Sequence, residues 1–189
     1  GSSRLSENSL KNGVREAAEY NEREIAAFLE MVHQALLSLD AKYKLEKGDE
    51  ARIMPTELLS YFFGSSSPFV KEKSIGELEE LVDYMLKQGE EIQKAMLGKG
   101  RPPRSYIHSC ASFLSNWISM RGRKDFCFLL VNYLTKAGTQ GARLEIVDLD
   151  PRNITTQVLD SCHAAVAMSG TLSPLVAFAD TVGLSNYKA

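Results

Sequence analysis

The segment AVAMSGTLSP at residues 165–174 contains the residues of this chain best suited to chemistry. An apolar run enters the polar turn Ser169-Gly170-Thr171, which presents two hydroxyls beside a glycine. Such a turn at the end of a strand commonly serves a nucleophile or a nucleotide. A hydrolase elbow requires G-x-S-x-G, but Ala167 stands where the first glycine should be and Thr171 where the second should be. The pattern therefore excludes this kind of nucleophile.

Neither a catalytic base nor a metal or phosphate motif accompanies that turn in the sequence. His33 and His108 fall in predicted helices and His163 opens a predicted strand, so none is placed to act as a base. The sequence contains no H-E-x-x-H, no calcium loop, and neither G-x-x-x-x-G-K-[ST] nor G-x-G-x-x-G. We therefore expect the three histidines to have structural or surface roles.

The three cysteines, Cys110, Cys127 and Cys162, stand far apart and form no C-x-x-C pair. This spacing suits neither a zinc nor an iron–sulfur site and indicates reduced thiols in an intracellular protein, cytoplasmic or nuclear. No apolar run approaches the ~20 residues that span a bilayer. The N-terminal GSSRLSENSL lacks the apolar core of a signal peptide. We expect no bound metal and no membrane partner.

Charge is unevenly distributed along the chain, although the net charge is only −2. Residues 1–100 hold 13 basic and 18 acidic side chains, whereas residues 101–189 hold 9 and 6. The stretch 94–124 has no acidic residue and seven basic ones, namely Lys94, Lys99, Arg101, Arg104, Arg121, Arg123 and Lys124. A polyanion could bind such a stretch, and a solvated basic face would explain it equally well.

The first 120 residues have the apolar periodicity of helices. The pattern predicts helices over 9–43 with a break at Asn21, a short helix over 56–63, and a helix from the capping box at Ser74 to Gly98. A basic linker, GKGRPPR, leads into a further helix over 103–120. Trp117 lies on the apolar stripe of that helix and is predicted to be core.

After residue 122 the pattern changes to that of strands. DFCFLLVNYL at 125–134 and RLEIVDLDP at 143–151 predict two strands joined by a turn. RNITTQVLDSC predicts a short helix, HAAVAMSG at 163–170 a buried parallel strand, and SPLVAFADTVG a last helix. The predicted fold class is α+β, with a predominantly helical body and a small partial α/β sheet segment.

The strands and the turn together resemble a known family. LEIVDLDP at 144–151, followed by VLDSCHAAVAMSGTLSP at 158–174, resembles the region of helicase motif III in XPD-type DNA helicases, the iron–sulfur members of superfamily two. In that family SGTLSP leaves a motor-domain strand, and an amphipathic helix like LVAFADTVGL follows. One position departs from the pattern, because Val176 stands where the family often has an acid.

The resemblance implies a division of the chain into three parts. The family carries a large helical insertion, the Arch domain, between the acidic box and motif III. Residues 1–8 then resemble a residual motor-domain segment, residues 9–122 a helical Arch domain, and residues 123–189 the returning segment of the first motor domain.

The resemblance also implies the activity of the parent protein. It would be an ATP-dependent 5′–3′ DNA helicase of DNA repair, nucleotide excision repair included, with ATP, magnesium and a 4Fe-4S cluster. This chain lacks the phosphate loop, the acidic box, the cluster cysteines and the second motor domain. Phosphoryl transfer needs these parts together, so we expect the chain alone to bind no cofactor and to show no ATPase or unwinding activity.

Roles for particular residues follow from the resemblance and from charge. In the parent, the hydroxyls of Ser169 and Thr171 would form hydrogen bonds near the acidic box, and Gly170 would let the neighbouring chain segment approach closely. The turn would then couple ATP state to DNA grip without doing chemistry itself. A single-strand channel pairs basic side chains with stacking platforms. On charge alone, the candidates for DNA contact are Arg101, Arg104, Tyr106, Arg121, Arg123 and Lys124.

Two further expectations concern partners. The helical body either helps to enclose single-stranded DNA beside the motor and iron–sulfur domains, or it is a protein-docking and gating module without direct DNA contact. The acidic first half favours a protein partner. Strand edges at 125–134 and 163–168 would be exposed in this chain, which predicts a homodimer through those strands.

Overall fold

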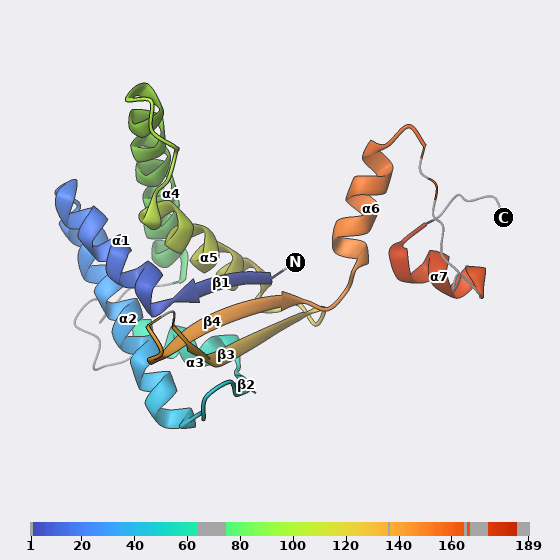
Figure 1. Ribbon diagram of the computed structural model, residues 1–189, viewed down its shortest axis with the longest axis horizontal. Coiled ribbons are helices and arrows are strands. Elements are labelled where there is room, and N and C mark those ends of the chain that lie inside the picture. Colours follow the sequence, from blue (N-terminus) through green and yellow to red (C-terminus); the bar gives the residue numbers. More distant parts are fainter. Residues whose placement is uncertain (1, 64–74, 136, 165, 167–173, 185–189) are drawn as a thin grey trace.

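The computed structural model describes residues 2–63, 75–135, 137–164, 166 and 174–184. Helices dominate, and one small sheet lies against them (Figure 1), which confirms the predicted α+β, predominantly helical class. In chain order the elements are β1 (Ser2–Ser6), α1 (Glu7–Glu19), α2 (Arg23–Tyr43), β2 (Glu50–Arg52), α3 (Pro55–Phe63), α4 (Ile75–Gly98), α5 (Tyr106–Met120), β3 (Phe126–Leu134), β4 (Gln140–Asp148), α6 (Arg152–Ser161) and α7 (Leu175–Val182).

The sheet has four strands in the order β1-β4-β3-β2, and every described pair is antiparallel. The predicted hairpin of β3 and β4 is confirmed, with Leu130 opposite Leu144 and Leu144 opposite Leu5 of β1. All three leucines are buried. The predicted parallel strand over 163–168 is not formed by its described members, since His163, Ala164 and Val166 lie outside any strand.

The expectation that 125–134 forms an exposed sheet edge is wrong. The amide of Ile53 donates to the carbonyl of Phe128 at 2.9 Å, and the amide of Asn132 donates to the carbonyl of Asp49 at 3.0 Å. Residues 48–53 therefore cover the side of β3 that faces away from β4. The backbone groups of residues 128–132 are therefore already paired on this side, which leaves less free edge for a second copy, and the homodimer itself stays a prediction.

Asn21 separates the first two helices, as predicted. Its φ of +58° lies in the left-handed region, which asparagine tolerates better than most residues, so the chain reverses between α1 and α2. At Gly13 an added Cβ would stand 2.9 Å from Leu29 Cδ1 of α2 and 3.5 Å from Cys110 Sγ of α5. The glycine thus permits three helices to meet at one point.

The helix predicted over 103–120 begins later, at Tyr106. Pro103 lies in the preceding connection, and Ser105 is the N-cap, with its hydroxyl accepting from the amide of His108 at 3.0 Å. The serine side chain accepts a hydrogen bond from a free amide of the first helical turn, which proline cannot do, and so Ser105 determines where α5 begins. The capping serine predicted for α4, Ser74, lies outside the described residues.

The helical body and the hairpin share one core. Trp117 is fully buried, as predicted, its indole nitrogen donates to the carbonyl of Pro55 at 3.1 Å, and its ring lies 4.7 Å from that of Phe128. Burying a large side chain of this kind stabilises a fold by roughly 1.5–3 kcal/mol. Because Phe128 belongs to β3, the core continues across the expected boundary at residue 122. Assignment of the flanking segments to a motor domain remains a prediction.

Helices α6 and α7 stand away from this body (Figure 1). No side chain of α6 is buried, and Ala179 is the buried residue of α7. The two helices contact each other, since the hydroxyl of Thr155 donates to the carbonyl of Val182 at 2.7 Å. None of the described helices is both long and apolar enough to cross a membrane.

Candidate nucleic-acid interface

The residues predicted to contact DNA lie at the two ends of α5. Arg101 and Arg104 are exposed in the connection before the helix, and Tyr106, its first residue, is 46% exposed. We call these three residues the entry cluster. Arg121, Arg123 and Lys124 follow the last turn and are all exposed, and we call them the exit cluster. With 1.5 Å of rise per residue, α5 separates the two clusters by roughly 20 Å.

A carboxylate from α1 fixes the start of α5. Glu16 Oε2 accepts from the Ser105 hydroxyl at 2.9 Å and from the Ile107 amide at 2.7 Å. A negative charge at this position also interacts favourably with the positive end of the helix dipole. Arg104 and Tyr106 therefore flank a helix start that is held by a second helix, whereas the backbone amide of Arg101 donates to the carbonyl of Met96 at 2.9 Å and places Arg101 at the end of α4.

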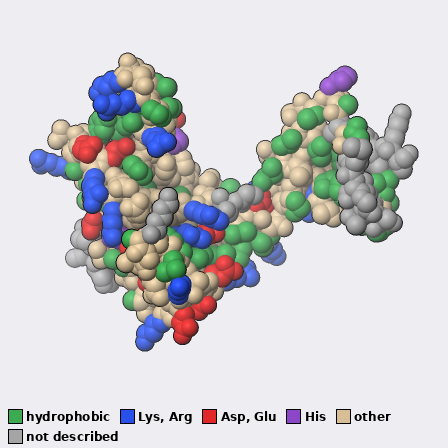
Figure 2. Space-filling model, viewed as in Figure 1, with side chains coloured by type: hydrophobic (Ala, Val, Ile, Leu, Met, Phe, Trp, Pro, Cys, Tyr) green, Lys and Arg blue, Asp and Glu red, His purple; other side chains and the backbone are tan. Residues whose placement is uncertain are grey.

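Close packing between α4 and α5 also holds this end of α5. A Cβ at Gly89 would stand 2.5 Å from the Cβ of His108 and 2.7 Å from its Cα. Only glycine allows this approach. Beyond Gly89, the last residues of α4 project from the body (Figure 1), and Figure 2 shows Lys and Arg side chains around this projecting end.

The entry cluster retains unneutralised charge. Within the described part of the chain, neither Arg101 nor Arg104 forms an ion pair. Two exposed guanidinium groups and one exposed phenol within residues 101–106 offer what a single strand requires, namely positive charge for phosphates and an aromatic face for a base.

The exit cluster is different because neighbouring groups already engage its arginines. Arg121 donates to the carbonyl of Ile118 and stands 4.0 Å from Glu79 Oε1. Arg123 forms an ion pair with Asp125 and lies 4.7 Å from the centre of the Phe126 ring. Charge counted from the sequence therefore overstates what this cluster can offer a phosphate.

Asn153 connects the exit cluster to α6 and β4. Its amide nitrogen donates to Asp125 Oδ2 and to Asp148 Oδ1, both at 2.8 Å, and its oxygen accepts from Arg123 at 3.2 Å. The bond from Arg123, followed by the bond from Asn153, holds the pKa of Asp125 well below its ordinary value. The same pairing with Asp125 raises the pKa of Arg123.

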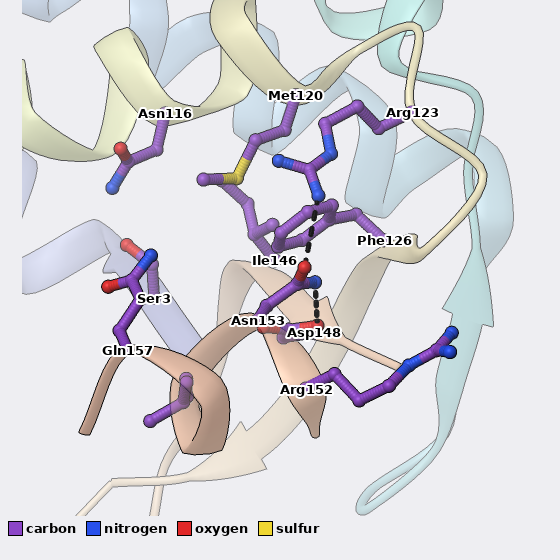
Figure 3. Close-up of a pocket in the computed structure, with 11 residues that line it drawn as sticks. Ser3, Asn116, Met120, Arg123, Phe126, Ile146, Asp148, Arg152, Asn153 and Gln157 are labelled. Carbon is purple, nitrogen blue, oxygen red and sulfur yellow. Dashed lines mark hydrogen bonds between the residues drawn. The ribbon is translucent and has the colours of Figure 1, made fainter. Parts of the chain in front are cut away.

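A pocket of about 570 Å³ opens beside this network (Figure 3). Side chains from β1, α5, β3, β4 and α6 line it, and Arg123 is the predicted DNA-binding residue that reaches it. The sequence analysis missed the pocket, including Asn116 and Gln157, because the lining comes from segments far apart in the chain. It also missed Glu16, since a lone helical glutamate carries no signal of its distant partner.

The other predicted residues are placed as follows. Ser169, Gly170 and Thr171 lie outside the described residues, so their coupling role stays a prediction. Cys110 is buried, Cys127 is half-buried and Cys162 is exposed, and all three are free thiols. Among the side chains that the structure describes, no group of His, Cys, Asp and Glu could hold a metal ion.

Comparison with known families supports the architecture described above. The family model of the helical and beta-bridge domain matches residues 13–188, from α1 to beyond α7. The match spans both the helical body and the hairpin, which agrees with their common core. This chain therefore belongs to the helical and beta-bridge domain family, the Arch-like domain of XPD-type helicases.

Proposed function

We propose that this chain is the Arch part of an ATP-dependent 5′–3′ DNA helicase of DNA repair, and that it helps to enclose single-stranded DNA. Membership of the family supports a helicase Arch role. The parent would supply ATP, magnesium and an iron–sulfur cluster, and the Ser169-Gly170-Thr171 turn would couple ATP state to DNA grip. The chain alone has no ATPase or unwinding activity in this proposal, because phosphoryl transfer needs the lysine, metal and arginine finger of the complete motor.

The observation that carries the DNA-binding part is the entry cluster. Arg101 and Arg104 are exposed and, among the described residues, without ion pairs, and Tyr106, two residues after Arg104, is exposed as well. Glu16 and Gly89 hold the start of α5, which carries Tyr106 and directly follows Arg104 and Ser105. A pre-positioned site loses less entropy when a strand binds, so these residues are better placed for DNA contact than the partly neutralised exit cluster.

Fluorescence anisotropy of a labelled single strand over a salt series tests this proposal. We expect R101A/R104A to weaken binding and to reduce the salt slope by about 1.4, since each contact with a single strand contributes about 0.7. R121A/R123A should have a smaller effect. The control is K47A/R52A, which removes two exposed charges near β2, away from the projecting end of α4. Equal losses in all three variants would show nonspecific charge attraction and contradict the proposal.

Exposed apolar side chains favour a second function, protein docking and gating. Val158 of α6 is 55% exposed and Val176 of α7 is 63% exposed. Figure 2 shows hydrophobic side chains across the lobe that these helices form. If no strand binds even at low salt, the grip resides in other parts of the helicase and docking becomes the better proposal.

A further inference from the structure

We propose that the pocket beside Asn153 binds a single nucleobase. This site is separate from the entry cluster and goes beyond the proposed function, although one of its tests uses a DNA strand. The volume of about 570 Å³ falls within the ~300–1,000 Å³ typical of small-ligand sites. No described side chain of the chain fills it.

The apolar part of the pocket suits the flat faces of a base. Met120 of α5, Phe126 of β3, Ile146 of β4 and Ile154 of α6 all contribute to its lining. Figure 3 shows the Met120 thioether and the Phe126 ring on the same side of the pocket. Thioether and aromatic groups both pack well against π-systems.

The polar part suits the edge of a base. Asn116 comes from α5, Ser3 from β1 and Gln157 from α6, and Figure 3 shows all three on the side of the pocket opposite Phe126. Among the described residues, none of the three side chains has a hydrogen-bond partner. Each amide offers donors and an acceptor close together, which is the complement of the mixed donors and acceptors on a base edge.

The charged groups around the pocket already form ion pairs or hydrogen bonds within the chain, which argues against a free phosphate or a cation as ligand. Arg123 pairs with Asp125, and Asp148 accepts from Asn153 and from the amide of Asp150. The guanidinium of Arg152 points away from the pocket (Figure 3) and pairs with Asp150. A neutral, flat molecule with a polar edge fits these conditions best.

Free nucleosides and strand bases share this chemistry, so the first test uses free nucleosides. Adenosine, guanosine, cytidine and thymidine are titrated separately into the isotope-labelled chain, and the side-chain amide resonances of Asn116 and Gln157 are followed. We expect at least one nucleoside to shift both resonances in a saturable way. Dissociation constants for N116A and Q157A should rise about tenfold, the loss typical of one hydrogen bond in a ligand site.

The second test separates base contact from phosphate contact. A short single strand and an abasic strand of equal length are compared for N116A/Q157A and for the control N8A/Q34A, which removes exposed amides of α1 and α2. We expect N116A/Q157A to weaken the normal strand about tenfold and to leave the abasic strand unchanged. R101A/R104A should weaken both strands, because it removes phosphate contacts. Thermal unfolding confirms that each variant is folded.

These outcomes distinguish the inference from the proposed function. Nucleoside shifts without strand binding would support the pocket and contradict the DNA-enclosing function. Strand binding that depends on Arg101 and Arg104, with unshifted amides and no effect of N116A/Q157A, would support that function and overturn the pocket. Equal loss on normal and abasic strands in N116A/Q157A would also overturn base recognition.

Discussion

Glu16 in α1 accepts a hydrogen bond from the backbone amide of Ile107 in α5 at 2.7 Å. The same oxygen accepts from the hydroxyl of Ser105, the N-cap of that helix, at 2.9 Å. One carboxylate thus satisfies a free amide of a helix that begins some 90 residues later in the chain, and it stabilises the end that carries Tyr106. The orientation of Arg104 and Tyr106 therefore depends on the packing of α1 against α5.

Replacing Glu16 with alanine should destabilise the chain by about 1–2 kcal/mol, because a charged acceptor is removed from a helix N-terminus and the Ile107 amide loses its partner. Urea unfolding followed by circular dichroism measures this change. Glu16→Gln should recover part of the loss, since it keeps an acceptor oxygen but lacks the charge. Glu19→Ala, at an exposed position of the same helix, is the control. Equal stability of the Glu16 and Glu19 variants would contradict the cap.

Gly89→Ala should be destabilising by about 1–3 kcal/mol, because its Cβ would meet the backbone of His108 at 2.7 Å and force α4 and α5 apart. Gly98→Ala tests the same substitution in open space, since nothing lies within 4 Å of a Cβ there. Alanine has the higher helix propensity, so this second variant should be neutral or slightly stabilising. The melting temperatures of the two variants check the prediction, and similar values for both would contradict the close approach.

The sequence was sufficient to predict the elements whose signals are local. Helical periodicity located α2, α4 and α5, the break at Asn21 followed from composition, and Trp117 was assigned to the core from its place on an apolar stripe. The β3–β4 hairpin was equally clear, because both strands are rich in β-branched and aromatic residues and a short turn joins them.

The sequence could not show which segments complete the sheet. Ser2–Ser6 reads as SSRLS and has only one apolar residue, yet it pairs along the whole of its length with β4. Glu50–Arg52 is too short to show a period of two, and its pairing makes β3 an interior strand. Both strands depend on long-range partners, as do the Glu16 cap and the pocket lined by Asn116 and Gln157.

The thiols should differ sharply in reactivity. Burial, with a smaller contribution from Glu16, raises the pKa of Cys110 to about 12 from an ordinary value of 9.0, whereas Cys162 is exposed. The thiolate is the reactive form, so a disulfide reagent at pH 8 should label Cys162 within minutes and Cys110 only after denaturant is added. Mass spectrometry of the labelled peptides provides the measurement, and rapid labelling of Cys110 in the folded chain would contradict its burial.

The raised pKa of Cys110 also predicts a dependence of stability on alkaline pH. The thiol ionises at lower pH in the unfolded chain than in the folded chain, where burial keeps it protonated. The contribution of the buried thiol to the free energy of unfolding is therefore fully present below pH 9 and is lost as pH rises from 9 towards 12. Cys110→Ala should make the fall in stability over this range shallower than in the unmodified chain. Cys162→Ala should leave the pH profile unchanged, and identical profiles for both variants would exclude Cys110 as a contributor.

Asn153 should control how firmly α6 is attached to the sheet. Its side chain joins Asp125, Asp148 and Arg123 through three hydrogen bonds of 2.8–3.2 Å, and no residue of α6 is buried. Since burial contributes so little, Asn153→Ala should increase amide hydrogen exchange in α6 while leaving α5 unchanged. Asn8→Ala, at an exposed site in α1, is the control.

The attachment of α6 should also respond to acid in a defined direction. Hydrogen bonds lower the pKa of Asp125, the one from Arg123 most and the one from Asn153 next. The contribution of the Asp125 carboxylate to stability is therefore present above the ordinary carboxyl pKa and is lost only as pH falls well below that value. The protection factors of the α6 amides, which correct for the intrinsic pH dependence of exchange, should therefore change little between pH 7 and pH 5. Asp125→Asn removes the ion pair with Arg123 and should give faster exchange throughout this range. If Asp125→Asn left the exchange of α6 unaltered, the network around Asn153 would not be what holds the helix.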